Sequence, residues 1–187
     1  MRETIPYAPG PTPQGGDLDQ TQRFIETELR SISEALRLSV VQAAYGGMQI
    51  FGTLVLPDAG PTPQQVIPWD GTQPAELSRV EASTAAGTLT VQESGVYNVF
   101  CTLSMEVSSQ RHYQFTVLRN GAPTNIVVVI DASGSSQAAN VSFGGLVQLR
   151  AGDILALYYT STVAGSALTI NASTFILFRV SELQKVM

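Results

Sequence analysis

Few residues in this 187-residue chain could carry acid–base or nucleophilic chemistry. His112 is the single histidine, so a Ser-His-Asp triad would have to use it. The G-x-S-x-G element that presents a nucleophilic serine is absent, and residues 134–136 (GSS) lie in a run of small residues typical of a loop. We therefore expect a protein that is not an enzyme.

Metal-binding patterns are similarly sparse. The chain has one cysteine, Cys101, and no His/Cys spacing that suits zinc. Asp131 and Asp153 could offer carboxylate oxygens to a calcium ion. The Gly152-Asp153 pair is better explained as a tight turn between two strands, so we predict no metal and no cofactor.

Charge is scarce throughout the chain. Hydrophobic residues make up 44% and charged residues 13%, which is about half the usual share of charge. The net charge of −5 argues against nucleic acid as a partner. There is neither a basic amphipathic helix nor an apolar run long enough to cross a bilayer, so we expect no membrane partner. A domain this poor in charge is expected to bury surface in an oligomer.

Residues 95–107 are the stretch around which a fold can be built. Apolar side chains occupy its odd positions and mostly polar ones its even positions, which predicts a strand with one face in a core. Cys101 lies on the apolar side, where it is expected to be a small core residue. The apolar side consists of Tyr97, Val99, Cys101, Leu103, Met105 and Val107.

The rest of the chain after residue 47 also reads as strands separated by turns. Asn120-Gly121 is a strong two-residue hairpin signal, because both central positions of that turn need a positive φ. About eight to ten short antiparallel strands with frequent turns predict a mainly β sandwich or jelly roll. The expected strands include residues 48–56, 112–119, 124–130, 141–149, 154–159 and 170–180.

Several of these strands are apolar on both faces. A two-layer sandwich covers only one face of each strand, so the second cover has to come from elsewhere. Copies of the same subunit are the simplest source. We therefore predict that a head interface between subunits is formed by Leu146, Ile154, Tyr158, Phe175 and Phe178.

The N-terminal part divides into two segments that precede a head of residues 47–187. Residues 1–16 hold four prolines and three glycines, so we expect an extended tail. It is either a disordered segment or a peptide that docks into a partner through the apolar residues Ile5, Pro6 and Tyr7.

Residues 17–46 are expected to form a helical stalk. Residues 19–22 (DQTQ) have the form of a capping box, and Gly46-Gly47 is expected to end the helix near Ala44. The apolar stripe has heptad-like spacing and either packs on its own domain or forms a short bundle of identical helices. We favour the bundle, with stalk contacts at Ile25, Leu29, Ile32 and Leu36.

At this point the residues resemble a known family. Five elements in order and spacing are similar to the tumour-necrosis-factor-like jelly roll, and particularly to the globular heads of complement-type proteins. The resemblance covers about residues 48–181 and implies a ten-strand jelly roll that assembles as a tight homotrimer. The elements are Leu89-x-Val91, Gly95-x-Tyr97-x-Val99, Leu118-Arg119-Asn120-Gly121, Val147-x-Leu149-x-x-Gly152-Asp153-x-Leu155-x-Leu157 and Ser173-x-Phe175.

The chain lacks the collagen repeat, signal peptide and disulfide pair of the animal members. Its order of Pro-rich tail, short helix and β-rich head resembles bacteriophage virion proteins instead. We therefore expect a short trimeric fibre or spike, made in the host cytoplasm and located on the virion. Its partners would be a portal, tail or capsid protein and a host surface receptor. The alternatives are a capsid decoration (cement) protein and a free carbohydrate- or protein-binding module.

Overall fold

The computed structural model describes residues 25–30, 44–57, 60–73, 77–107, 111–132, 137–162 and 168–182. The chain divides into two compact units, one formed by Met1–Gln42 with Gln184–Met187 and the other by Ala43–Leu183. In the first unit, residues 25–30 are helical. The predicted anchor residues Ile5, Pro6 and Tyr7 and the stalk residues Ile32 and Leu36 lie outside the described residues.

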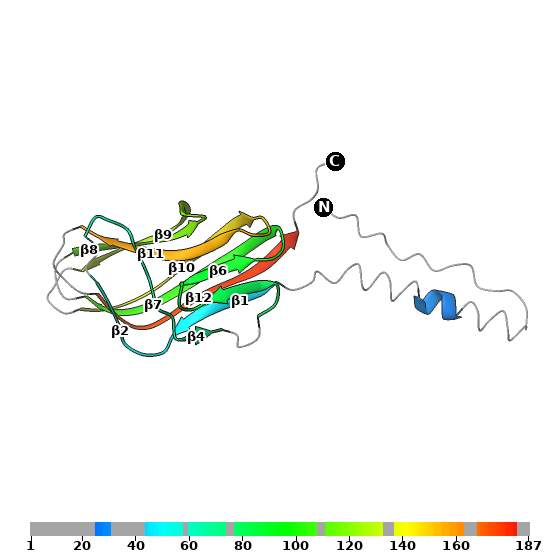
Figure 1. The fold of residues 1–187 in the computed structure, drawn as a ribbon, viewed down its shortest axis with the longest axis horizontal. Helices are drawn as coiled ribbons and strands as arrows, with labels where there is room; N and C mark the ends of the chain where they lie inside the picture. The colour runs from blue at the N-terminus through cyan, green and yellow to red at the C-terminus, as the bar shows by residue number, and fades with distance from the viewer. Residues whose placement is uncertain are drawn as a thin grey trace, which may run out of the picture. The chain divides into compact units, whose positions relative to one another are not determined.

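The described part of the second unit consists of strands and connecting loops (Figure 1). Ten of its strands are three residues or longer, and β3 and β4 are two-residue pairings. The strands are β1 (Tyr45–Ile50), β2 (Leu54–Leu56), β3 (Gln64–Gln65), β4 (Gly71–Thr72), β5 (Val80–Ser83), β6 (Thr88–Val91), β7 (Gly95–Val107), β8 (Arg111–Arg119), β9 (Ala122–Ala132), β10 (Gln137–Leu149), β11 (Ile154–Ser161) and β12 (Leu168–Glu182).

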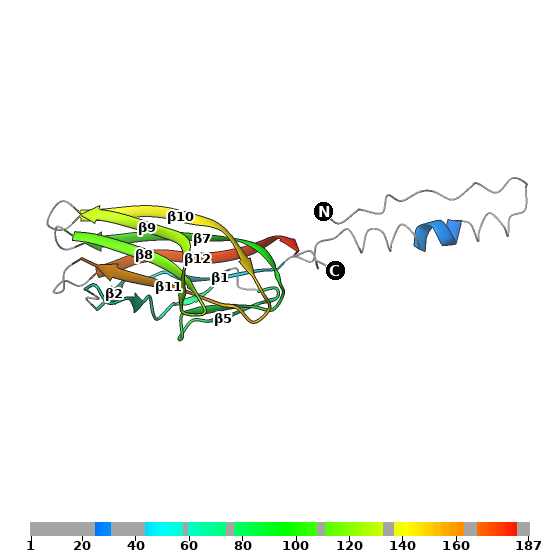
Figure 2. The same cartoon turned by 90° about the horizontal axis from the view of Figure 1, so that it is seen from above.

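The strands form two antiparallel sheets that pack face to face (Figure 2). Sheet A has the order β10-β7-β12-β1-β4, with β2 paired to β12. Sheet B has the order β5-β6-β11-β8-β9, with β3 paired to β11. The predicted mainly β jelly-roll sandwich is confirmed.

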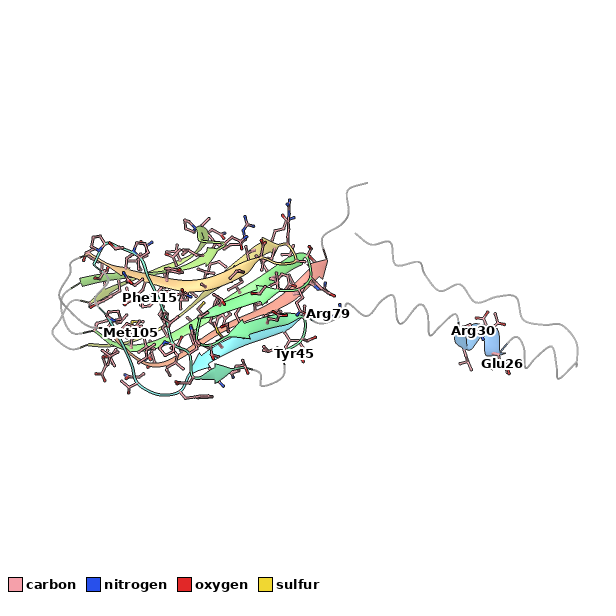
Figure 3. All side chains as sticks on the ribbon, in the orientation of Figure 1. Glu26, Arg30, Tyr45, Arg79, Met105 and Phe115 are labelled. Atoms are coloured by element: carbon pink, nitrogen blue, oxygen red, sulfur yellow. The ribbon has the colours of Figure 1, made fainter. Side chains whose placement is uncertain are left out.

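β7 lies between β10 and β12 and supplies the centre of the core. Its six odd-numbered apolar residues are all at most 2% exposed, as their alternation predicts. Sheet B supplies the opposing side chains from β8 and β11, among them Phe115 and Tyr159, whose rings stack with centroids 6.2 Å apart. In Figure 3, Met105 of sheet A and Phe115 of sheet B both lie between the two layers.

The two predicted tight turns are present at the same end of the sandwich. Asn120 and Gly121 have φ values of 52° and 80°, so the β8–β9 hairpin uses the left-handed turn that the Asn-Gly pair predicts. Gly152 has φ of 89°, and the Asp153 carboxylate accepts a hydrogen bond from the backbone N–H of Arg150 at 2.8 Å. Asn120 Nδ2 donates to the other Asp153 oxygen at 2.7 Å, which ties the two turns together.

The boundary between stalk and head differs from the prediction. Gly46 and Gly47 lie inside β1 rather than behind a helix, and the compact head unit begins at Ala43 rather than at residue 47. Both glycines permit close approach of neighbouring segments. A Cβ on Gly46 would lie 2.8 Å from Val80 side-chain atoms, and one on Gly47 would lie 2.7 Å from the Phe175 carbonyl oxygen.

The single strand predicted over residues 48–56 is two strands. β1 and β2 both pair with β12, but residues 51–53 leave the ladder between them. There the backbone N–H groups of Phe51 and Gly52 donate to Asp70 Oδ2 at 2.7 and 3.1 Å. A side chain from another loop therefore replaces the strand pairing at this point.

Candidate assembly and binding surfaces

The five residues predicted to form one head interface lie in three different places. Leu146 and Phe178 lie on the outer face of sheet A and are 60% and 43% exposed. Ile154 and Tyr158 belong to β11 and lie on the outer face of the other sheet. Phe175 is fully buried between the sheets, with its ring 6.1 Å from that of Trp69, so it is a core residue and is not available to an interface.

Trp69 packs against Phe175 and is buried as well. It is 4% exposed, and its indole Nε1 donates to the carbonyl oxygen of Val66 at 2.8 Å. Residues 66–69 follow the short strand β3 and form a loop. The tryptophan therefore closes the core beside Phe175 and offers no binding surface.

The outer face of sheet A carries a continuous apolar area, here called the sheet A patch. Asn98 of β7 pairs with Leu146 on one side and Phe178 on the other. In the next row, Phe100 of β7 pairs with Ile176 of β12. Neighbouring strands lie about 4.8 Å apart, so these side chains adjoin one another. The patch consists of Phe100, Leu146, Ile176 and Phe178.

The patch ends where the outer face becomes polar. One row further along, Thr102 pairs with Ser142 and Thr174, and the two threonine hydroxyls lie 2.7 Å apart in a hydrogen bond. Gln49 of β1 pairs with Thr174 in the same row. The apolar area is therefore confined to the half of the face near the start of β1.

The two edges of the sandwich differ in length. At one edge, β4 and β5 have two and four residues. At the other, β9 and β10 have 11 and 13 residues and lie side by side (Figure 2). Asp131 is the only charged residue in these two long strands, and Val127 and Val129 of β9 are 46% and 56% exposed. Long, uncharged edge strands of this kind pair with other chains unless something covers them.

An ion cluster fixes the end of the head where the chain arrives from its N-terminal segment. The Glu93 carboxylate contacts the guanidinium groups of both Arg79 and Arg179, the latter at 2.6 Å. The Arg179 side chain is 4% exposed, and the Arg179 backbone N–H donates to the Ala44 carbonyl at 2.8 Å. Arg79 and Tyr45 appear at this end of the head in Figure 3.

Tyr97 belongs to the same end. Its hydroxyl donates to the Glu93 carbonyl oxygen at 2.8 Å. Burial raises the pKa of Tyr97, and the nearby charge of Arg179 opposes this only in part. The hydroxyl therefore stays protonated and serves as a donor.

The outer face of sheet B holds an open groove of about 310 Å³. Its floor comes from β8 and β11, and Pro63 and the β8–β9 hairpin border it. The lining has no charged side chain. The residues that line it are Pro63, Gln114, Thr116, Leu118, Gly121, Pro123, Tyr158, Tyr159 and Thr160.

The residues considered for chemistry do not gather at one site, although two of them form a pair. His112 Nδ1 pairs with the Asp131 carboxylate, and both side chains are mostly exposed. Asp153 lies at the other end of β8, beside Asn120, with its carboxylate occupied by the turn. Within the described residues, no group of three or more His, Cys, Asp or Glu side chains could hold a metal ion. Cys101 is fully buried, and burial raises the pKa of its thiol.

The helical residues 25–30 carry the described half of the predicted stalk stripe. Ile25 and Leu29 are four residues apart and are 51% and 61% exposed, so both are open to a partner. None of the helical segments that the structure describes is long and apolar enough to cross a membrane.

Sequence reasoning missed half of the sheet A patch. Phe100 and Ile176 were not singled out, nor were Val127 and Val129 at the β9 edge. A signal for Phe100 was present, because it is the one aromatic residue at an even position in β7. Such a residue points away from the core when the odd positions point inward.

The fold is similar to those of two solved structures, although no protein-family model and no curated protein matches the sequence. The Eiger TNF of S. frugiperda has a TM-score of 0.58 and 17% identity, covering 78% of this chain and 96% of that one. The globular domain of zebrafish complement 1qA protein has a TM-score of 0.55 and 13% identity, covering 75% of this chain and 99% of that one. The second compact unit therefore has the tumour-necrosis-factor-like, complement-head jelly-roll fold.

Proposed function

We propose that this chain is a non-enzymatic structural and binding protein whose jelly-roll head assembles as a homotrimer. Domains with this fold are typically binding modules without enzymatic activity, and they usually form trimers. The scarcity of charge supports assembly, because 13% charged residues leave much of the surface uncharged.

The proposal rests on one observation in particular, which is that each head carries two different exposed apolar surfaces. The sheet A patch is exposed, and so is the β9–β10 edge with Val127 and Val129. Because these surfaces differ, a contact between them is heterologous and closes into a ring when the rotation between subunits permits. Three copies arranged in this way would cover both the patch and the long edge of every head.

The location we propose is a bacteriophage particle, with the protein acting as a short fibre or spike. Support comes from the order of the segments, namely the Pro-rich residues 1–16, a helix with exposed Ile25 and Leu29, and the head. Three tails on one axis would bind a virion protein together, so a weak single contact would become a firm one. Ile5, Pro6 and Tyr7 would supply the apolar contact, and the head would face the host surface.

Complementation of a phage that lacks this gene tests the location. Deletion of residues 1–16 should leave a soluble trimer that is missing from purified particles. A matched variant with Ile5, Pro6 and Tyr7 changed to Ser keeps the tail length and should also be missing, whereas the full chain should be incorporated. If the deletion variant were incorporated normally, the attachment would be made by the head or stalk, which would favour a capsid decoration protein. Absence of the full chain from particles would favour a free binding module.

A further inference from the structure

The groove on sheet B contains Tyr158, which is held in place through both its backbone and its hydroxyl group. Tyr158 is half-buried on β11 and pairs through its backbone with Gln65 of β3. The side-chain amide of Gln65 donates to the carbonyls of Ala86 and Gly87 at 2.6 and 3.0 Å, which fixes its orientation. Gln65 Oε1 then lies 3.4 Å from the Tyr158 hydroxyl. The ring is therefore positioned before any ligand arrives.

Polar but uncharged groups lie beside this ring. Phe115 points into the core (Figure 3), so its neighbours Gln114 and Thr116 face outward from β8. Thr116 pairs with Tyr158, and Gln114 pairs with Thr160. The Gln114 amide N–H donates to the Thr116 hydroxyl at 3.2 Å. Hydroxyls and an amide are thus placed along one side of the aromatic ring.

We infer that this groove binds a neutral carbohydrate. A groove without charged side chains gives no electrostatic reason to bind an anion or a cation. A ring face together with hydroxyl and amide groups matches a sugar, which has an apolar ring face and polar edges. At about 310 Å³ the groove is at the small end of the usual range of ligand sites, which fits a short saccharide or the end of a glycan.

The site lies on the opposite sheet from the sheet A patch but adjoins the β9 edge. Thr116 and Gln114 pair with Val127 and Val129, and Pro123 of β9 lines the groove, so every residue of the site comes from one chain. The inference deepens the binding part of the proposed function and does not depend on trimer formation. A monomer that bound glycans would contradict the trimer alone, and a trimer that bound none would contradict the groove alone.

The test is an array of neutral and anionic glycans probed with the full chain. Wild type should bind neutral glycans, and Tyr158→Ala should weaken the binding at least about tenfold, because the ring face is lost. Tyr158→Phe keeps the ring and should stay within about threefold of wild type. Thr53→Ala, an exposed change in the loop between β1 and β2, is the matched control and should bind as wild type does.

Thermal unfolding and sedimentation of each variant separate loss of binding from loss of structure. If Tyr158→Ala does not fold, the exposed variant Gln114→Ala and amide shifts in labelled wild type locate the bound glycan instead. Three results would overturn the inference: no neutral glycan bound by wild type, binding restricted to anionic glycans, or shifts located away from β8 and β11.

Discussion

Leu146 and Phe178 lie on opposite sides of Asn98 on the outer face of sheet A. Leu146 belongs to β10 and Phe178 to β12, and both pair with Asn98 of β7. The two residues are 32 positions apart in the sequence. Both are substantially exposed in the single chain. Two large apolar side chains around a small polar one form the centre of the surface that we assign to the trimer.

Asn98→Asp should break the trimer while leaving the subunit folded. Asn and Asp side chains have nearly the same shape, but the carboxylate places an unpaired charge in a surface from which assembly excludes water. This costs about 3 kcal/mol or more. Sedimentation at micromolar concentration measures the effect. Gln64→Glu on β3 makes the same amide-to-carboxylate change at an exposed residue away from the patch and from the β9–β10 edge, and should remain trimeric. If the two variants sedimented with the same mass, the patch would not be part of the subunit interface.

Glu93→Gln should destabilise the head more than Arg79→Gln does. The Arg179 guanidinium is almost fully buried and would lose the opposite charge of Glu93, a change that typically costs about 3–5 kcal/mol. The Arg79 side chain is 35% exposed, so loss of its pair should cost about 1 kcal/mol or less. Urea unfolding of both variants provides the comparison. An Arg79 variant at least as unstable as the Glu93 variant would contradict this assignment.

Tyr97→Phe and Tyr113→Phe should have different effects on stability. The Tyr97 hydroxyl donates to Glu93, and its removal leaves a carbonyl oxygen without that donor, at a cost of about 1 kcal/mol. The buried Tyr113 hydroxyl finds no hydrogen-bond partner among the residues that the structure describes, so its removal should be neutral or stabilising. Thermal unfolding distinguishes the two, and a destabilised Tyr113→Phe would indicate a partner for its hydroxyl.

Cys101 should not react with a thiol reagent in the folded protein. Its pKa is raised by burial, so the reactive thiolate is suppressed, and the side chain is inaccessible as well. With Ellman's reagent at neutral pH, the folded protein should release none of the coloured thiolate product. After guanidinium unfolds the chain, the absorbance should correspond to one reactive thiol per chain. Fast labelling of the native protein would show that the core opens at β7.

Leu29→Ser combined with Leu36→Ser should separate the stalk helices but leave the head trimeric. A stripe of about two heptads buries too little area to hold three chains together by itself. Helical content should fall in circular dichroism, while the sedimenting mass should stay that of the wild type. Complete dissociation of the double variant would place most of the assembly energy in the stalk.

The strands with one buried face could be predicted from the sequence. In β7 and β8 the apolar residues alternate, and the structure buries that side in each strand. Period-two patterning is informative there because a core covers only one face.

The surfaces of the head could not be predicted in the same way. The strand β12 is apolar on both faces at residues 175–178. The alternation of residues along the strand therefore does not predict that Phe175 points inward and Phe178 outward. The register with β7 decides this. The groove joins β8 to β11 and to Pro63, and such proximity depends on sheet order rather than on any local pattern. Trp69 lies in a loop, where no periodicity indicates burial.

The mass of the wild-type protein in solution tests the central claim most directly. Sedimentation equilibrium of the full chain at micromolar concentration should give a single species with the mass of three 19.9 kDa chains. A species with the mass of one chain would contradict the assignment of the sheet A patch and the β9–β10 edge to subunit contacts.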